Sequence, residues 1–573
     1  MLQELWTPEG EILKNNPDIQ PWNVYPRPQL KRDNWLNLNG QWDFTAVGGP
    51  SVLPLDYDLS IRVPFCPEAP LSGIHGHFPE GTNLCYRRKF ILPEGFNRGR
   101  VLLHIGAADQ VADVYVNGKE VCHHEGGYES FSCDITDALL DENELVIRCV
   151  DDLDNQSYPY GKQVLPEKRG GMWYTPVSGI WQTVWLESVP ETYVKKLNIE
   201  NRGYGVTISI DPVMEGTVTV PELGEFALVD GKVTITPENP NLWSPENPHL
   251  YDFTLKAGED CIESYFAIRS LEVKKVGDYP RLCLNGKPYF FHGLLDQGYW
   301  PEGLLTAPAP ESFERDILAM KKLGFNTLRK HIKVEPEEFY YQCDRLGMIV
   351  WQDMVNNSDY NFLRDTALPT AGIQTLNDKN LHKDQLHRTS FLLNAAKTVM
   401  QLKNHPSICY WTIFNEAWGQ FDSDEVYETF RQWDDTRFID STSGWFRRKK
   451  SDVDSRHVYF KKVKLTGDGR KPLVLSEFGG KTYKTGGHIF NPEKSYGYGG
   501  CGDIAELNKA VAALYMDEIV PCIRNGLCAA IYTQVSDVED EINGLLTYDR
   551  RVEKLTESAM VPVAEALKRA MEG

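Results

Sequence analysis

The sequence contains no Cys-x-x-Cys pair, and its 12 cysteines are scattered along 573 residues. Disulfide frameworks and structural zinc sites both need cysteines at short, regular spacings. The scatter therefore predicts free thiols in a reducing compartment. No group of histidines and acidic residues has the spacing of metal ligands either, so we expect neither a metal ion nor another cofactor.

Two further features are missing. No stretch approaches the roughly 18 apolar residues that a membrane helix needs, and residues 1–8 lack the basic-then-apolar pattern of a secretory signal. Basic residues are also scarce, because 60 Lys and Arg stand against 81 Asp and Glu, a formal charge of −21. Nucleic acids and anionic membranes attract basic surfaces. We therefore expect a cytoplasmic protein that binds neither nucleic acid nor membrane.

The first part of the chain has the pattern of all-β domains. Short strands alternate with Gly, Pro and an Asn117-Gly118 pair that is typical of a tight hairpin turn. No helical pattern of any length interrupts residues 42–188. These features predict a jelly-roll β-sandwich over residues 1–190. A second helix-free run of short strands predicts an immunoglobulin-like β-sandwich over residues 191–275.

Strands and helices alternate from residue 282 onward, which is the pattern of a parallel sheet. An amphipathic helix ended by glycine is expected over residues 311–324. Eight strands are expected at residues 290–295, 326–331, 348–353, 407–415, 438–440, 457–459, 473–477 and 529–534. The fifth and sixth have the weakest pattern. Eight such strands predict a TIM barrel over residues 276–573.

Two of the expected barrel strands end in glutamate. Strand 407–415 is followed by Glu416, and strand 473–477 ends in Glu477. Side chains at the carboxyl ends of barrel strands face the active site, and a pair of carboxyl groups there suggests cleavage of glycosidic bonds. The alternative interpretation is that each glutamate forms a salt bridge at the barrel rim.

Further motifs lie at residues 86–90, 113–118, 178–182 and 324–331, and at Asn415-Glu416 and Ser476-Glu477. With these motifs in this order, the chain resembles glycoside hydrolase family 2, whose members include β-galactosidases, β-glucuronidases and β-mannosidases. The resemblance follows nearly the whole chain, from a sugar-binding jelly roll through an immunoglobulin-like sandwich to a TIM barrel.

The resemblance implies an exo-acting enzyme that hydrolyses terminal sugars with retention of configuration, in two displacement steps. By position it makes Glu477 the nucleophile and Glu416 the general acid/base. It also implies that Asn415 binds the sugar 2-hydroxyl and that Arg329 supports the nucleophile. A structural ion pair within the barrel is an equally good interpretation of Arg329, and the two roles are compatible.

Other residues at the expected barrel mouth are candidates for sugar binding. A carboxylate at the end of the third strand commonly binds a hydroxyl. The histidines have either that role or a structural one, and the tryptophans either stack on sugar rings or pack in the core. The loop of residues 160–163 in the jelly roll could also reach the barrel mouth. The remaining candidates are Asp353, His331, His457, Trp351, Trp418 and Tyr459.

Three departures bear on the identity of the sugar. β-Glucuronidases of the family usually carry Asn-x-Lys after the eighth strand, but residues 540–546 contain no lysine. Strand eight ends in Thr533-Gln534 rather than in the tryptophan common in relatives, which predicts a more polar pocket. In a basic cluster at residues 445–450, Arg447 and Arg448 are either solvated or bind the carboxylate of an anionic sugar.

Three hypotheses follow for the function. The leading one is a β-galactosidase-like enzyme that acts on a small glycoside or an oligosaccharide. The alternative enzyme is a β-uronidase, a galacturonidase or a glucuronidase, that uses the basic loop. The third is a catalytically silent carbohydrate-binding protein, because two β-sandwiches could act as lectin modules. Homo-oligomers are common in the family, although the sequence shows no coiled-coil or interface motif.

Overall fold

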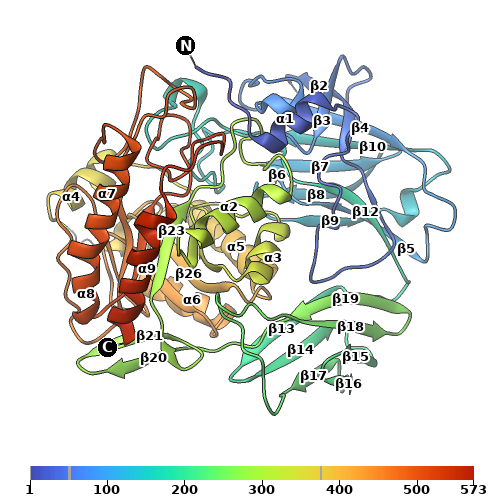
Figure 1. The fold of residues 1–573 in the computed structure, drawn as a ribbon. Helices are drawn as coiled ribbons and strands as arrows, with labels where there is room; N and C mark the ends of the chain where they lie inside the picture. Colours follow the sequence, from blue (N-terminus) through green and yellow to red (C-terminus); the bar gives the residue numbers. More distant parts are fainter. Residues whose placement is uncertain (1, 50–52, 374–376, 573) are drawn as a thin grey trace.

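The computed structural model describes residues 2–49, 53–373 and 377–572. Within them, two β-sandwiches precede an eight-stranded parallel barrel (Figure 1). The predicted architecture is confirmed. A short helix that the sequence did not predict, α1 (Pro8–Asn15), precedes the first sandwich, and the Thr7 side chain caps it by accepting from the Gly10 N–H.

The first sandwich consists of two main antiparallel sheets. The smaller sheet has the strand order β1 (Trp35–Asn37), β12 (Val184–Val189), β5 (Arg100–Ile105) and β9 (Phe131–Asp134). The larger sheet has the order β3 (Leu59–Val63), β2 (Gly40–Val47), β4 (Asn83–Phe90), β10 (Asn143–Val150), β7 (Val111–Val116) and β8 (Lys119–Glu125). A short pair joins β6 (Ala108–Asp109) to β11 (Gly179–Ile180). The core between the sheets contains Trp42, Tyr86 and Leu103, as expected where alternate residues of each strand face inward.

Two predictions for this sandwich have different outcomes. The Asn117-Gly118 turn is confirmed, because it joins β7 to β8 with φ angles of 52° and 78°, which Asn and Gly tolerate. The prediction of free thiols is wrong for Cys122 and Cys133, which form a disulfide. These cysteines belong to edge strands of the two different sheets, so the packing of the sheets brings them together. The other ten cysteines, all within the described residues, are free.

The second sandwich is smaller. One sheet contains β13 (Lys196–Arg202), β14 (Gly205–Asp211) and β17 (Lys232–Ile235). The other contains β16 (Gly224–Ala227), β15 (Gly216–Val220), β18 (Tyr251–Ala257) and β19 (Asp260–Phe266). A three-stranded sheet of β20 (Leu271–Val276), β21 (Tyr279–Leu284) and β22 (Lys287–Pro288) then leads into the barrel. Leu282 and Leu284 of this sheet pack in the same apolar cluster as Phe291 and Trp351 of the barrel.

The barrel strands are parallel and almost close into a ring. They are β23 (Phe291–Asp296), β24 (Thr327–Lys330), β25 (Ile349–Asp353), β26 (Ile408–Asn415), β27 (Phe438–Ser443), β28 (Asp454–Val458), β29 (Leu473–Gly479) and β30 (Leu527–Thr533). The last strand pairs back with the first. The remaining gap lies between β27 and β28, where the Ser443 hydroxyl is 3.0 Å from His457 Nε2.

The barrel helices pack outside the strands (Figure 1). They are α2 (Glu311–Lys322), α3 (Glu337–Leu346), α4 (Leu368–Thr370), α5 (Gln385–Leu402), α6 (Ser423–Trp433), α7 (Ile504–Leu514), α8 (Val520–Arg524) and α9 (Glu557–Glu572). The predicted helix before Gly324 is confirmed as α2. In the described chain, β27, β28 and β29 follow one another without an intervening helix, which explains the weak pattern of the fifth and sixth strands. Among the described residues, every helix is too short or too polar to cross a bilayer.

Candidate active site

A cavity of about 510 Å³ opens where the carboxyl ends of the barrel strands face the first sandwich. Asn415, Glu477 and Thr533 line it from three strand ends. Lys162 and residues 170–173 line it from a loop of the first sandwich. The prediction that this loop reaches the barrel mouth is therefore confirmed, and the loop closes one side of the cavity.

Arg329 of β24 lies at the centre of the hydrogen-bond network below this cavity. Its buried Nε donates to Asp353 Oδ1 at 2.9 Å, and its Nη1 donates to Glu477 Oε1 at 3.0 Å. Its Nη2 donates to Asn415 Oδ1 at 2.9 Å. A guanidinium presents its donors in one rigid plane, so this single side chain connects the ends of three other strands.

Glu477 is held as an ionised carboxylate. Its second oxygen, Oε2, accepts from the Tyr459 hydroxyl at 2.8 Å and lies 3.6 Å from His457 Nδ1. Burial alone would raise the pKa of Glu477, but the fields of His457 and Arg329 outweigh burial and lower this pKa to about 2. The side chain therefore carries a negative charge at neutral pH.

Glu416 lies in a different environment. The chain turns sharply after β26, because Glu416 and Ala417 both adopt left-handed backbone, with φ angles of 49° and 67°. Such strain costs about 1–3 kcal/mol per residue and is concentrated at functional sites. The Glu416 side chain is 24% exposed, and its Oε1 lies 2.7 Å from His457 Nδ1. Within the described part of the chain it forms no ion pair with an arginine or a lysine.

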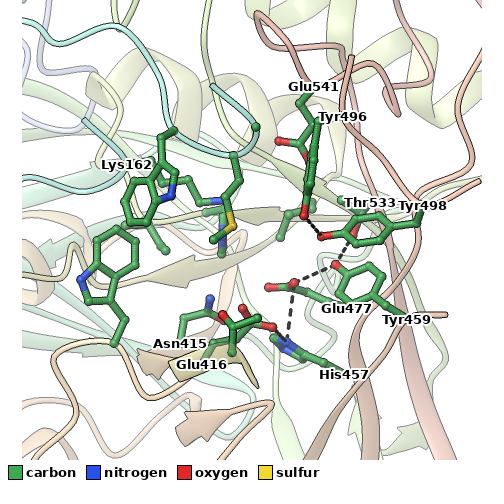
Figure 2. Close-up of a pocket in the computed structure, with 18 of the residues that line it drawn as sticks. Lys162, Asn415, Glu416, His457, Tyr459, Glu477, Tyr496, Tyr498, Thr533 and Glu541 are labelled. Carbon is green, nitrogen blue, oxygen red and sulfur yellow. Dashed lines mark hydrogen bonds and ion pairs between the residues drawn. The ribbon is translucent and has the colours of Figure 1, made fainter. Parts of the chain in front are cut away.

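The two carboxyl groups are close together. One carboxylate oxygen of Glu416, one of Glu477 and a ring nitrogen of His457 lie within 4.8 Å of one another (Figure 2). Carboxyl groups about 5–5.5 Å apart are typical of retaining glycosidases, whereas inverting enzymes need about 6.5–9.5 Å. The same three side chains could also act as ligands of a metal ion. The sequence did not predict this set of ligands, because the three residues are far apart in the chain. Both oxygens of Glu477 already accept hydrogen bonds, which favours acid–base and nucleophilic chemistry here.

Asp353 and His331 act as a pair. Asp353 does not line the cavity, because its Oδ1 accepts from Arg329 and its Oδ2 lies 2.7 Å from His331 Nδ1. Burial and the nearby Lys162 cation lower the pKa of His331 to about 4, so the ring is neutral at pH 7. Its Nδ1–H then donates to Asp353 and its Nε2 is left as an acceptor. His331 lines the cavity, so a sugar contact by either residue of this pair stays a prediction, and the geometry favours His331 over Asp353 for it.

The predicted tryptophans separate into two locations. Trp351 is fully buried and stacks on Tyr410 in the barrel core, with ring centroids 3.9 Å apart. Of its two interpretations, core packing is therefore correct. Trp418 lines the cavity and packs edge-to-face against Trp173, with centroids 4.8 Å apart. The candidates His457 and Tyr459 also line the cavity.

The arginines of the basic loop do not line the cavity. Arg447 Nη1 donates to Asp454 Oδ1 at 2.5 Å, and Arg448 Nε lies 3.4 Å from Asp378 Oδ1. Each guanidinium therefore faces a carboxylate of the protein itself. This geometry does not support the hypothesis that they bind a sugar carboxylate.

Sequence reasoning missed several cavity residues, which are Trp173, Tyr360, Phe362, Tyr496 and Tyr498. Tyr496 and Tyr498 lie in a glycine-rich loop after β29, and aromatic residues between glycines beside a catalytic strand are a signal that could have found them. Glu541, in the stretch without a lysine, also lines the cavity. Its carboxylate accepts from the Tyr174 hydroxyl at 2.5 Å and from Asn543 Nδ2 at 3.0 Å.

Comparison with known proteins identifies the family. A model described as "Glycosyl hydrolases family 2, sugar binding domain" matches residues 27–190, one described as "Glycosyl hydrolases family 2" matches residues 191–269, and "Glycosyl hydrolases family 2, TIM barrel domain" matches residues 275–557. The chain belongs to glycoside hydrolase family 2. The predicted resemblance is confirmed, and the cavity lies at the mouth of the TIM-barrel domain, against a loop of the sugar-binding domain.

Individual relatives carry different names. A β-galactosidase of Thermoanaerobacter pseudethanolicus is 24% identical over 494 residues, covering 78% of this chain and 61% of that protein. A β-glucuronidase of Paenibacillus borealis is 26% identical over 394 residues, 61% of each chain. This chain thus spans less than two thirds of the length of these relatives. A solved β-glucuronidase of Dictyoglomus thermophilum shares the fold, with a TM-score of 0.72, 20% identity, and coverage of 96% of this chain and 98% of that one.

Proposed function

We propose that this family 2 protein is an exo-acting retaining β-glycosidase in which Glu477 is the nucleophile and Glu416 the general acid/base. The observation that carries the proposal is the close pair of carboxyl groups in contrasting environments. The buried Glu477 is kept ionised with the help of Arg329, whereas Glu416 is partly exposed and, within the described residues, forms no ion pair with an arginine or a lysine. Environments that separate two carboxyl groups in this way divide the acid and nucleophile roles.

The reaction would proceed in two balanced steps. First, a Glu477 oxygen bonds to the anomeric carbon while the bond to the leaving oxygen breaks and that oxygen takes the proton of Glu416. Then water attacks the same carbon, gives a proton to Glu416 and releases Glu477 as a carboxylate. Asn415 would bind the sugar 2-hydroxyl. Because its Oδ1 accepts from Arg329, its amide N–H groups are free to donate to that hydroxyl.

The wall that the first sandwich adds to the cavity supports exo action. The sandwich loop that carries Lys162 and Trp173 closes one side of the barrel mouth, so a terminal sugar fits better than the middle of a chain. The charges favour a neutral sugar, such as a galactoside. Glu541 presents a carboxylate in the stretch where a glucuronidase would carry its lysine, and the arginines of the basic loop are already paired.

A second candidate is a β-uronidase, favoured by Lys162 in place of the basic loop. In the described chain the Lys162 ammonium forms neither an ion pair nor a hydrogen bond, and it lies close enough to lower the pKa of both His331 and Glu477. An unpaired lysine in a half-closed cavity could bind the carboxylate of a uronide. Relatives named β-glucuronidase fit this candidate.

The test is turnover of nitrophenyl β-galactoside, β-glucuronide and β-galacturonide by wild type, Glu477→Gln and Lys162→Met. We expect wild type to hydrolyse the galactoside best and Glu477→Gln to lose several orders of magnitude in kcat/KM on every substrate. A uronide preference that Lys162→Met abolishes would establish the second candidate. Absence of turnover across the panel would overturn both and favour a carbohydrate-binding protein.

A further inference from the structure

One side of the cavity is built from aromatic rings, which we call the aromatic wall and define as Trp173, Tyr360, Phe362 and Trp418. Trp173 packs edge-to-face on Trp418 and on Tyr360, with centroids 4.8 and 5.0 Å apart. The rings of Tyr360 and Trp418 also pack edge-to-face, with centroids 5.9 Å apart. Phe362 stands at the mouth with 67% of its surface exposed. Large apolar side chains exposed at the mouth of a cavity mark a binding surface.

The aromatic wall lies on the side of Glu416. Trp418 is two residues beyond Glu416, on the strained turn that follows β26. Burial raises the pKa of Tyr360, and the nearby charge of Glu416 raises it further. Glu477 is held from the other side, by Tyr459, whose ring stacks on Tyr498 at 4.2 Å (Figure 2).

This placement decides which part of a substrate the wall would contact. In a retaining reaction the leaving oxygen takes its proton from the general acid, so the leaving group departs past that residue. The sugar ring itself stays beside the nucleophile. The aromatic wall therefore lines the space of the leaving group.

The chemistry of the wall differs from that of the sugar end. Two polar side chains line the cavity beside Glu477: His331 lies close enough to lower the pKa of Glu477, and Thr533 shares the Tyr459 hydroxyl with it. On the wall, the Trp418 Nε1–H points to the Ser358 carbonyl at 3.4 Å, and the Tyr360 hydroxyl bonds to Thr366. Ring faces and the Met172 side chain remain to contact a ligand. A second sugar would leave its hydroxyls with few partners here, whereas a planar aromatic group would bury apolar surface against the rings.

We propose that the natural leaving group is aromatic rather than a second sugar, and that Trp173 and Phe362 determine this preference. The proposal rests on the retaining glycosidase function proposed above. The substrate class is then an aryl β-glycoside, in which the departing oxygen belongs to a phenol. The residues of the wall would act in the first step alone, because the leaving group is gone before water attacks.

The test compares three substrates that share the sugar preferred in the panel, namely a 4-methylumbelliferyl glycoside, a methyl glycoside and a disaccharide. In Phe362→Ala and Trp173→Ala we expect kcat/KM for the umbelliferyl substrate to fall about tenfold, the scale of one lost aromatic contact with its buried area. For the methyl glycoside it should change less than about twofold. Phe362 is exposed, so its variant tests the proposal even if Trp173→Ala is unstable.

Phe460→Ala is the matched control. Phe460 also lines the cavity and is 82% exposed, but its ring packs on Tyr498, on the nucleophile side. It should leave the ratio of umbelliferyl to methyl turnover unchanged. The proposal is overturned if wild type prefers the disaccharide and the variants of the aromatic wall no longer hydrolyse it. It is also overturned if these variants lower kcat/KM equally for all three substrates. If wild type hydrolyses none of the three, the proposed function itself has failed.

Discussion

Replacement of Arg329 by Gln should lower the stability of the fold and weaken the ionisation of Glu477, the proposed nucleophile. The fully buried guanidinium contacts Asp353 and Glu477. Its removal takes away the guanidinium that these two buried carboxylates share, and breaking a buried pair in this way costs about 3–5 kcal/mol. We therefore expect the free energy of unfolding at pH 7 to fall by an amount in that range.

The pH dependence gives the more specific result. The pKa of Glu477 lies at about 2 in the folded protein, against an ordinary value of 4.5. A lowered pKa contributes stability that is present above pH 4.5 and is lost as the pH falls toward 2, about 3 kcal/mol at 1.36 kcal/mol per pH unit. Without Arg329, one of the two main fields that outweigh burial is lost, so the pKa of Glu477 rises. The acid limb of kcat/KM should therefore move to higher pH.

The assay is a pH profile of kcat/KM from pH 8 down to the lowest pH at which both enzymes stay folded, beside urea unfolding at pH 7. Arg281→Gln is the control, because this buried arginine donates to the carbonyls of Ile523 and Leu527 and contacts no catalytic group. It should lose stability and leave the acid limb in place. A folded Arg329→Gln enzyme with an unmoved acid limb would refute the reasoning.

Three further predictions concern single contacts. Tyr459→Phe removes the hydroxyl that donates to Glu477, the proposed nucleophile. Because a hydrogen bond to a charged group contributes about 1.5–3 kcal/mol, kcat/KM should fall about 10- to 100-fold, with little change in melting temperature. Trp351→Ala should cost about 3–5 kcal/mol in urea unfolding yet keep the substrate preference, because this ring packs in the core; a changed preference would contradict that location. The double variant Arg447→Ala, Arg448→Ala should leave the ratio of uronide to galactoside turnover unchanged, as both side chains face aspartates outside the cavity.

The fold and the placement of Glu416 and Glu477 at one barrel rim could be predicted because their signals are local. A buried apolar run that ends abruptly in Asn415-Glu416 or in Ser476-Glu477 shows both the strand and the end at which its polar residues emerge. Eight such strands in one order then bring the two glutamates to the same rim. Their separation depends on strand stagger, which the pattern does not encode.

The remaining features depend on tertiary contacts. Arg447 and Arg448 look like a free basic cluster in sequence, but folding places Asp454 and Asp378 beside them. The disulfide between Cys122 and Cys133 joins two sheets whose packing no spacing rule predicts. A tryptophan in this strand could face either the core or the cavity, and the strand pattern does not distinguish the two. The structure places Trp351 in the core.

The central claim is that Glu477 attacks the anomeric carbon. A 2-deoxy-2-fluoro glycoside of the preferred sugar, with dinitrophenolate as its leaving group, slows the second step and lets the covalent intermediate accumulate. Mass spectrometry of peptides from the trapped enzyme should then find one fluorosugar on the peptide that contains Glu477, and none on Glu477→Gln. Attachment to another residue, or an inverted sugar as the first product seen by NMR, would contradict the mechanism.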